Sequence, residues 1–459
     1  MDLRLTTALT VAKLIAFSLK AKGSGATAAP GLIALKIDPN LIGKLCAKIS
    51  GGSIIISGTN GKTTTARLTF DALSKDHKII HNRQGSNLMR GIASALIAKT
   101  TISGKVLGDL AIWETDEATL PVAIKDTSAQ IVVLLNLFRD QLDRYGEVEA
   151  TRQKWQETIS KLPKTATLIL NADDPGVASF YKIFSGKIST FGINDPKIST
   201  FQTTGVLDIK NCPVCQSKLI YKTYTFGHLG DYKCTKCDFK KPNIQISASN
   251  LLFGQDFITS ADIKIASANY KTKYNLPGIY NVYNVLAAAS IATALKISAK
   301  KILDSTKNFT PVFGRFQKIQ IKDKNIYIFL IKNPTGANEI LKVLSANNNI
   351  NLLTILNDNF ADGTDVSWIW DTNWETLSQK TNNITISGTR AWDIATRLKY
   401  AGYRLSKDNV YEQIESSIEA ALSTMNKNNT LYILPTYTAL LSLEQILKKE
   451  SGHIKWQNQ

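Results

Sequence analysis

The chain has 459 residues, of which 44% are hydrophobic and 20% charged, and its formal net charge at pH 7 is +18. This length exceeds a typical single domain and provides apolar material for two or three cores, and no uncharged apolar run reaches the roughly 18 residues that a transmembrane helix needs. The excess of Lys and Arg suits an anionic ligand or a membrane surface, but without an aromatic–basic RNA motif it does not predict nucleic acid as a partner.

The first predicted element is an N-terminal helix. Apolar residues from Leu3 to Leu19 recur at helical spacing, and Lys13 and Lys20 interrupt the stretch, which favours a first helix over a signal peptide. A loop rich in Gly, Ala and Pro follows from Gly23 to Gly31. Residues 1–50 are therefore predicted to be a helix and a lead-in to the first large domain.

A strand, a Gly-containing loop and a helix come next, in the order of a phosphate-binding site. The strand is the β-branched run Ser53–Ile56, and the helix-like segment begins at Ala66. Backbone N–H groups of such a loop, together with the N-terminus of its helix, point at an anion. The expected nucleotide-binding residues are Gly58, Thr59, Asn60, Gly61, Lys62, Thr63 and Thr64.

Lys62 and Thr63 carry the chemistry of this loop. Lys62 can reach the terminal phosphates of a nucleotide and act catalytically by stabilising charge on the transferred group, and the Thr63 hydroxyl can bind Mg²⁺. Glu114 follows another apolar run and suits a further ligand of that ion. A strict P-loop would carry Gly where Ile56 stands, so the loop departs from the common pattern.

Alternating strand and helix patterns after residue 51 predict an α/β domain with a mostly parallel sheet. One of its strands leads into the polar segment Asn136–Asp143. Short β-like runs and a helix with Asn281 and Asn284 on one face complete this nucleotide-binding domain over residues 51–305.

Four of the five cysteines form two C-x₂-C knuckles that are 18 residues apart. This spacing is typical of a Cys₄ zinc ribbon, inserted over residues 205–243, in which four thiolates bind one structural Zn²⁺ and leave no open position for water. Disulfide bonds are the alternative, and they would be disfavoured in the reducing environment of the cytosol. The predicted ligands are Cys212, Cys215, Cys234 and Cys237.

Residues 315–459 alternate strand and helix again after a linker, Asn308–Gly314, and predict a Rossmann-like C-terminal domain. An acidic loop with Asp362 and Asp365 follows one strand, and such a loop at the end of a strand is where α/β domains place their chemistry. The expected strands are Asn325–Ile331, Asn351–Leu356, Asn383–Ser387 and Leu431–Leu434.

Taken in order, these segments resemble the Mur ligase family, which also includes folylpolyglutamate synthases. The resemblance implies a Mur-ligase-type ATP-binding domain, activation of a carboxylate as an acyl phosphate, and displacement of the phosphate by an amine. It also implies that Asn281 and Asn284 contact adenine and that Arg315 contacts phosphate. The family usually carries a metal-binding His where this chain has Gln141, which leaves a second Mg²⁺ open.

Within that family, the zinc ribbon and the segment 357–371 resemble the MurT branch, the ATP-dependent subunits of lipid II isoglutaminyl synthase. The resemblance implies ATP, Mg²⁺ and Zn²⁺ as cofactors and a GatD-type glutaminase subunit as partner in a heterodimer. The reaction implied is amidation of the α-carboxyl of D-glutamate in the lipid II stem peptide. The implied location is cytoplasmic, with a peripheral contact to the inner face of the cell membrane as one option.

The sequence agrees that glutamine hydrolysis belongs to a partner. No Cys lies in a Gly-flanked nucleophile elbow, and the histidines sit in no triad motif and are interpreted as surface or locally hydrogen-bonded residues. The resemblance suggests that this chain lends the partner's triad a carboxylate, Asp365 by preference and Asp362 second. The histidines are His77, His81, His228 and His453.

Two other functions stay open. One is a stand-alone Mur-type or folylpolyglutamate-type ligase that uses an amino acid as nucleophile, which the ribbon and the segment 357–371 disfavour. The other is a nucleic-acid-binding NTPase that uses the ribbon and the positive charge as its contact surface, and it predicts ATP hydrolysis that nucleic acid stimulates with a steep salt dependence.

Overall fold

The computed structural model describes residues 2–21, 28–82, 87–139, 148–201, 207–254, 257–307, 309, 315–321, 323–426 and 429–450. Gln141 and all of the predicted linker except Phe309 lie outside these residues. Arg315 opens a strand, but its side chain also lies outside the described part.

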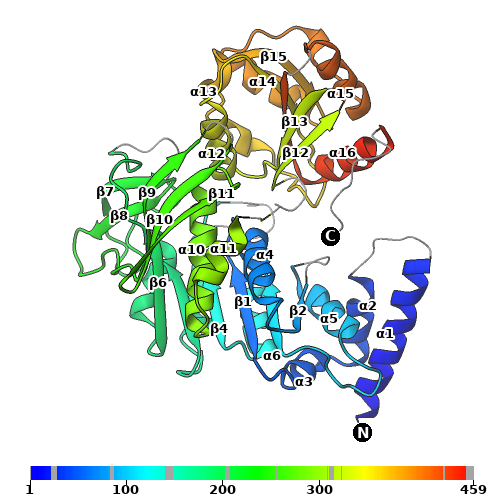
Figure 1. Ribbon diagram of the computed structural model, residues 1–459, viewed down its shortest axis with the longest axis vertical. Coiled ribbons are helices and arrows are strands. Elements are labelled where there is room, and N and C mark those ends of the chain that lie inside the picture. The colour runs from blue at the N-terminus through cyan, green and yellow to red at the C-terminus, as the bar shows by residue number, and fades with distance from the viewer. Residues whose placement is uncertain are drawn as a thin grey trace.

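The larger sheet has nine strands among the described residues, in the order β11-β10-β9-β6-β5-β4-β1-β3-β2 (Figure 1). Neighbouring strands from β2 to β9 run parallel, while β10 and β11 extend the sheet antiparallel. The strands are β1 Ser53–Ser57, β2 Ile79–His81, β3 Leu110–Glu114, β4 Ile131–Leu134, β5 Thr167–Asn171, β6 Lys187–Ile193, β9 Ile246–Phe253, β10 Thr259–Ile265 and β11 Ala268–Tyr274.

Helices cover both faces of this sheet, which is why its central strands are continuous apolar runs. Successive side chains of β1 enter opposite cores, Ile54 and Ile56 beneath α4, α10 and α11, and Ile55 beneath the helices of the other face. The helices of this half are α1 Leu3–Ala21, α2 Ala29–Ile37, α3 Leu41–Cys46, α4 Lys62–Leu73, α5 Met89–Ala98, α6 Leu120–Thr127, α8 Val148–Ile159, α9 Pro175–Ala178, η1 Ser179–Lys182, α10 Ile279–Ala294 and α11 Lys300–Thr306.

The N-terminal region contains two helices, α2 and α3, in addition to the one that the sequence predicts. Helix α2 begins at Ala29, inside the stretch predicted as a loop, and Pro30 in its first turn has no intrahelical hydrogen bond to lose. A Cβ on Gly31 would lie 2.0 Å from the carbonyl oxygen of Arg90. Gly31 is therefore needed for the close packing of α2 against α5, although its local sequence is typical of a loop.

The smaller sheet has five strands within the described residues, in the order β12-β13-β16-β14-β15, and lies at the top of Figure 1. All neighbours run parallel except β12 and β13. The four strands predicted for this half are confirmed as β13 to β16. The elements are β12 Arg315–Ile321, β13 Lys324–Phe329, α12 Pro334–Leu344, β14 Ile350–Ile355, η2 Ser367–Asp371, α13 Glu375–Ser378, β15 Thr381–Ser387, α14 Ala391–Tyr400, η3 Lys407–Asn409, α15 Ile414–Ser423, β16 Thr430–Pro435 and α16 Tyr437–Glu450.

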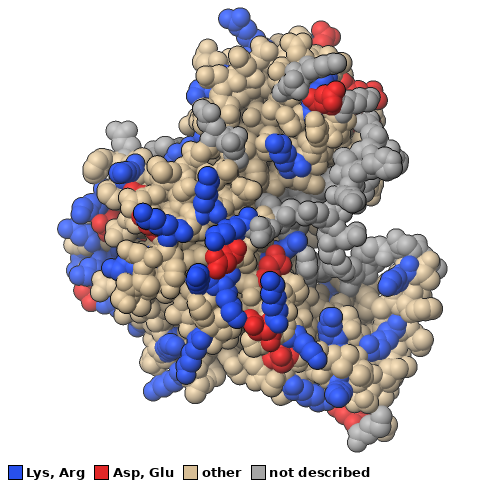
Figure 2. Space-filling view, viewed as in Figure 1, with Lys and Arg blue, Asp and Glu red and all other residues tan. Residues whose placement is uncertain are grey.

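The ribbon insert contains an antiparallel hairpin, β7 Leu219–Phe226 and β8 Leu229–Cys234, at the left of Figure 1. Its small core includes Tyr232 and Phe239, and the Tyr232 hydroxyl donates to the carbonyl oxygen of Ala172 at 2.9 Å. Figure 2 shows that Lys and Arg gather over this hairpin. Its exposed lysines include Lys210, Lys218, Lys222, Lys233, Lys236 and Lys240.

None of the helices in the described ranges is both long enough and apolar enough to cross a bilayer.

Candidate active site

The loop between β1 and α4 requires glycine at two positions. Gly58 and Gly61 have φ values of +140° and +93°, a region that L side chains rarely adopt. A Cβ on Gly61 would lie 2.1 Å from Asn284 Oδ1, and one on Gly58 would lie 2.9 Å from the backbone nitrogen of Asn136. Both glycines therefore let neighbouring chain segments approach the loop closely.

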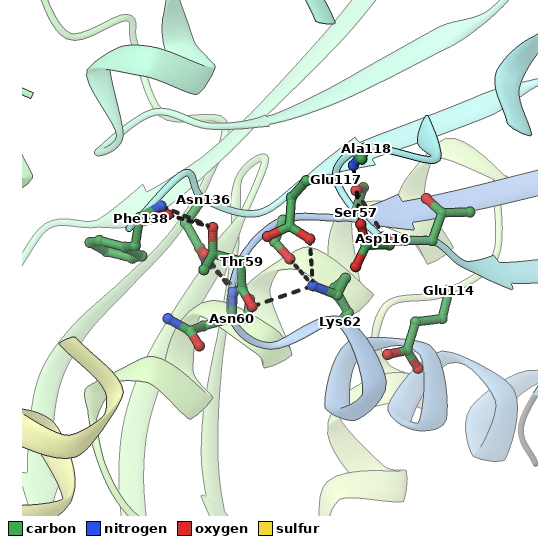
Figure 3. A network of polar contacts seen from close by, with 12 residues as sticks. Ser57, Thr59, Asn60, Lys62, Glu114, Asp116, Glu117, Ala118, Asn136 and Phe138 are labelled. Carbon is green, nitrogen blue, oxygen red and sulfur yellow. Dashed lines mark hydrogen bonds and ion pairs between the residues drawn. The ribbon is translucent and has the colours of Figure 1, made fainter. Parts of the chain in front are cut away.

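Lys62 is the first residue of α4, and its side chain folds back over the loop (Figure 3). Its Nζ donates to the carbonyl oxygen of Gly58 at 2.5 Å and lies 3.0 Å from Glu117 Oε2. The side chains of Lys62 and Glu117 are only 9% and 8% exposed. The ammonium group is thus held in place at the mouth of the loop, and Glu117 is a site residue that sequence reasoning missed, although it lies three residues after Glu114.

Thr63 and Glu114 lie together on the other side of Lys62. The Thr63 hydroxyl donates to Glu114 Oε1 at 2.6 Å. Glu114 ends β3, and Asn82 fixes its backbone by donating to its carbonyl oxygen at 2.8 Å and accepting from its N–H at 3.0 Å. A hydroxyl and a carboxylate oxygen this close are the hard oxygen donors that Mg²⁺ prefers, so these two residues fit that ion.

The segment after β4 clamps the phosphate loop. The Asn136 amide accepts from the N–H of Asn60 at 2.8 Å and donates to its carbonyl oxygen at 3.0 Å. The Thr59 hydroxyl makes two bonds with the backbone of Phe138, donating to the carbonyl oxygen at 3.1 Å and accepting from the N–H at 3.0 Å. Four side chain–backbone bonds therefore fix the loop against this segment (Figure 3).

Asn281 and Asn284, the predicted adenine contacts, lie buried on one face of α10. The Asn284 amide donates to Asn281 Oδ1 at 3.0 Å, and its own Oδ1 accepts from the Thr65 hydroxyl at 3.3 Å. The structure thus brings Asn284 to the first turn of α4, beside the phosphate loop. Contact with adenine stays a prediction.

The C-terminal domain reaches the same loop through two residues that sequence reasoning missed. Lys332 Nζ donates to the carbonyl oxygen of Thr59 at 3.3 Å, and Asn333 Nδ2 donates to Asn60 Oδ1 at 3.2 Å. Asn333 also caps α12, accepting from the N–H of Gly336 at 2.8 Å. The local signal for this cap was Asn-Pro after a strand, but nothing local indicated its tertiary contact.

The two carboxylates of the acidic loop have different surroundings. Asp362 is buried and accepts from the N–H and hydroxyl of Thr438 at 2.7 and 2.5 Å, and its burial raises the pKa of its carboxyl although these bonds oppose the shift. Asp365 is exposed and accepts from the N–H of Ser367 at 2.8 Å. Asp362 therefore holds the start of α16, while Asp365 faces solvent at the start of η2.

His228 is buried, so the surface location that the sequence-based interpretation allowed is wrong for this histidine. It lies in the turn between β7 and β8 with its side chain 0% exposed, and its ring centroid is 4.5 Å from that of Phe138. Its Nε2 is 3.3 Å from Asp174 Oδ2, and its Nδ1 is 3.9 Å from Asp208 Oδ2. A turn residue is usually exposed, and here the docking of the hairpin onto the segment after β4 buries it.

The four ribbon cysteines come together as predicted, with all four sulfur atoms within 4.8 Å of one another. Cys212 Sγ lies 3.6 Å from Cys237 Sγ, and Cys215 Sγ lies 3.4 Å from Cys234 Sγ. These separations exclude disulfide bonds and are close to the roughly 3.8 Å that a tetrahedral ion with four Zn–S bonds of about 2.3 Å would set. The cluster therefore fits a structural Zn²⁺.

We expect the purified protein to contain about one Zn²⁺ per chain, because four thiolates fill a tetrahedral site. Replacing Cys234 with Ser should lower the bound zinc and the thermal midpoint of unfolding, since binding energy at such a site is folding energy. Metal analysis and thermal melting measure both effects. Cys46→Ala is the matched control and should keep the zinc, whereas zinc-free wild-type protein purified without chelator would refute the site.

Two family models match the chain. The Mur ligase middle domain matches residues 56–234, and the MurT ligase C-terminal model matches residues 330–440. Two similar curated proteins, from Streptococcus pneumoniae and Staphylococcus aureus, are both named lipid II isoglutaminyl synthase (glutamine-hydrolyzing) subunit MurT. The first is 34% identical over 97% of this chain and 98% of its own length, and the second is 34% identical over 98% and 99%.

Solved structures agree on the fold. A pseudomurein peptide ligase type C from Methanothermus fervidus has a TM-score of 0.64 at 25% identity, covering 87% of this chain and 79% of its own. MurF ligase from Thermotoga maritima, solved with ADP, has a TM-score of 0.65 at 13% identity over 91% of this chain and 84% of its own. The predicted Mur-type fold is confirmed, and the chain belongs to the MurT family of Mur-type ligases.

Proposed function

We propose that this chain is the ATP-dependent subunit of a glutamine-hydrolysing lipid II isoglutaminyl synthase. It activates the α-carboxyl of D-glutamate in the lipid II stem peptide, and ammonia converts this group to the amide of D-isoglutamine. The observation that carries the proposal is the similarity, over nearly the full length, to proteins of that name. The contact between the phosphate loop and the C-terminal domain supports it.

The proposed reaction has two steps. A carboxylate oxygen attacks the γ-phosphorus of ATP, and ADP leaves with the electron pair of the broken P–O bond, so that an acyl phosphate forms. The nitrogen lone pair of ammonia then attacks the carbonyl carbon, phosphate leaves with the C–O electron pair, and the nitrogen loses one proton. Both steps depend on positioning the reactants and stabilising phosphoryl charge.

The site residues divide these tasks. The N–H groups of the loop Gly58–Thr64 hold phosphate, and Lys62 stabilises charge on the transferred group. Thr63 and Glu114 would hold Mg²⁺, whose role is to neutralise the phosphate oxygens. The buried Asn281 and Asn284 bind adenine. Arg315 also contacts phosphate. We place the lead-in at residues 1–50, the ATPase with its ribbon at 51–305 and the C-terminal domain at 315–459.

A GatD-type partner supplies the ammonia in this proposal, and the cysteines support that arrangement. All five are among the described residues: Cys46 is buried, and the other four form the sulfur cluster. None of them is placed to act as a glutaminase nucleophile. We therefore assign glutamine hydrolysis to the partner subunit of a heterodimer.

We place the reaction at the inner, cytoplasmic face of the cell membrane, where the lipid part of the substrate would lie. The outer face of α1 supports a peripheral contact. Leu3, Leu14 and Phe17 lie on this face, opposite the buried Leu5, Ala8, Leu9 and Ala12, and are 77%, 62% and 76% exposed. The helix contains Arg4, Lys13 and Lys20 and no acidic residue, which suits an anionic lipid surface.

Amidation of lipid II in vesicles tests the function. The chain, co-purified with its partner, should convert the stem peptide to the isoglutamine form with ATP and glutamine, as measured by mass spectrometry, and should co-sediment with the anionic vesicles. Omitting ATP should stop the reaction, while omitting the partner should stop it with glutamine but not with ammonium salt. Ligation of an amino acid without any partner would instead support the stand-alone ligase.

A further inference from the structure

Arg139 joins the two halves of the molecule. Its Nε donates to Asp208 Oδ1 at 2.8 Å, and its Nη2 donates to Asp371 Oδ2 at 2.9 Å. Asp208 lies in the ribbon insert, whereas Asp371 is the last residue of η2 in the C-terminal domain. One planar guanidinium therefore bridges Asp208 and Asp371, which are 163 positions apart in the sequence.

Residues 136–139, which include Arg139, each make at least one hydrogen bond to another part of the chain. Asn136 and Phe138 clamp the phosphate loop, as described above. The N–H of Leu137 donates to Asp174 Oδ2 at 2.8 Å, and the N–H of Arg139 donates to Asp208 Oδ2 at 3.1 Å. This side of the bridge is a rigid anchor that does not depend on Asp371.

On the C-terminal side of the bridge, the exposed Asp365 and Asp371 lie near opposite ends of the same short helix, η2. Asp365 accepts from the N–H of Ser367 at the start of η2, and Asp371 ends the same short helix. The ion pair with Arg139 therefore ties the Asp365 segment to a frame that also fixes the phosphate loop.

We propose that Arg139 is a positioning residue that couples the two half-reactions, by holding the Asp365 segment in register with the ATP site. The inference rests on the proposed function, because it takes Asp365 as the carboxylate that this chain lends to the triad of the glutaminase partner. Loss of the bridge leaves the phosphate loop in place and removes the tie between η2 and Arg139, while the buried Ile369 and the bond from Asn338 to the carbonyl oxygen of Asp371 still hold η2 on the C-terminal domain. The rate of glutamine-driven amidation should then fall, while the rate of ammonia-driven amidation should stay the same.

The exposure of the bridge favours coupling over stability as its role. The side chains of Arg139 and Asp371 are 30% and 35% exposed, and ion pairs at such positions add little to the stability of a fold. Asp208, by contrast, is only 4% exposed, so removing Arg139 would leave a buried carboxylate without its partner. Asp371 is therefore the better residue to change.

The test compares Asp371→Ala with the wild-type complex, using either glutamine or ammonium salt as nitrogen source. The ratio of glutamine-driven to ammonia-driven amidation should fall by about fivefold or more, the range of ordinary coupling between sites. Arg139→Lys should lower the same ratio, since an ammonium cannot make both contacts of the fork. The double variant should fall no further than Asp371→Ala alone, because both changes break one bridge.

Asp393→Ala is the matched control, because it removes an exposed ion pair with Arg390 inside the C-terminal domain and should leave the ratio unchanged. An unchanged ratio for Asp371→Ala would overturn the coupling role, and so would an equal loss with both nitrogen sources or additive losses in the double variant. A wild-type complex that amidates lipid II with neither glutamine nor ammonium salt would instead contradict the proposed function itself.

Discussion

Replacing Lys62 with Ala should lower ATP-dependent amidation by at least about a hundredfold, with glutamine and with ammonia alike. The ammonium group lies over the phosphate loop, and we propose that it stabilises charge on the transferring phosphoryl group, an effect worth about two to three orders of magnitude in rate at comparable sites. The measurement is product formation by the complex under saturating ATP.

Two controls separate chemistry from folding. Lys62 pairs with the buried Glu117, so Lys62→Ala leaves a buried carboxylate without its cation, and thermal melting must show that the variant is folded. The double variant Lys62→Met with Glu117→Gln removes both charges and should be equally inactive but better folded. Lys75→Ala, an exposed lysine just after α4, should keep full activity. Near-normal amidation by folded Lys62→Ala would rule out this phosphate site.

Asp365→Asn should lower glutamine-driven amidation by about two orders of magnitude or more and leave ammonia-driven amidation nearly intact. A glutaminase triad needs a carboxylate that orients its His and stabilises the positive charge that the imidazole acquires. The neutral amide of Asn cannot stabilise that charge. The substitution should leave the loop structure unchanged, because the Asn side-chain oxygen can still accept from the N–H of Ser367. Rates with the two nitrogen sources, measured on the assembled complex, decide the outcome.

Asp362→Asn provides the contrast. Asp362 is buried and accepts two hydrogen bonds from Thr438, so this substitution should lower the thermal midpoint and reduce both reactions together. Equal losses for Asp365→Asn would place that residue in the fold or in the ligase site rather than in the partner's triad.

Much of the site follows from local sequence. The phosphate loop was predictable because a β-branched strand, a glycine-containing loop and a helix start follow one another within about twenty residues. Each of these patterns determines the backbone conformation of its own residues. The cysteine cluster was predictable for the same reason, since each knuckle presents two thiolates by local geometry. The parallel sheet followed from apolar runs such as β1, which are buried on both faces.

The remaining features were decided by tertiary structure. Glu117 meets Lys62 across 55 residues, Lys332 meets Thr59 across 273, and Asp371 meets Arg139 across 232. No local pattern encodes such contacts, because they arise only when separate elements pack. Asp362 and Asp365 look alike in sequence, and only burial against Thr438 distinguishes them. His228 likewise reads as an ordinary turn residue, and it is buried because the ribbon hairpin docks onto the segment that clamps the phosphate loop.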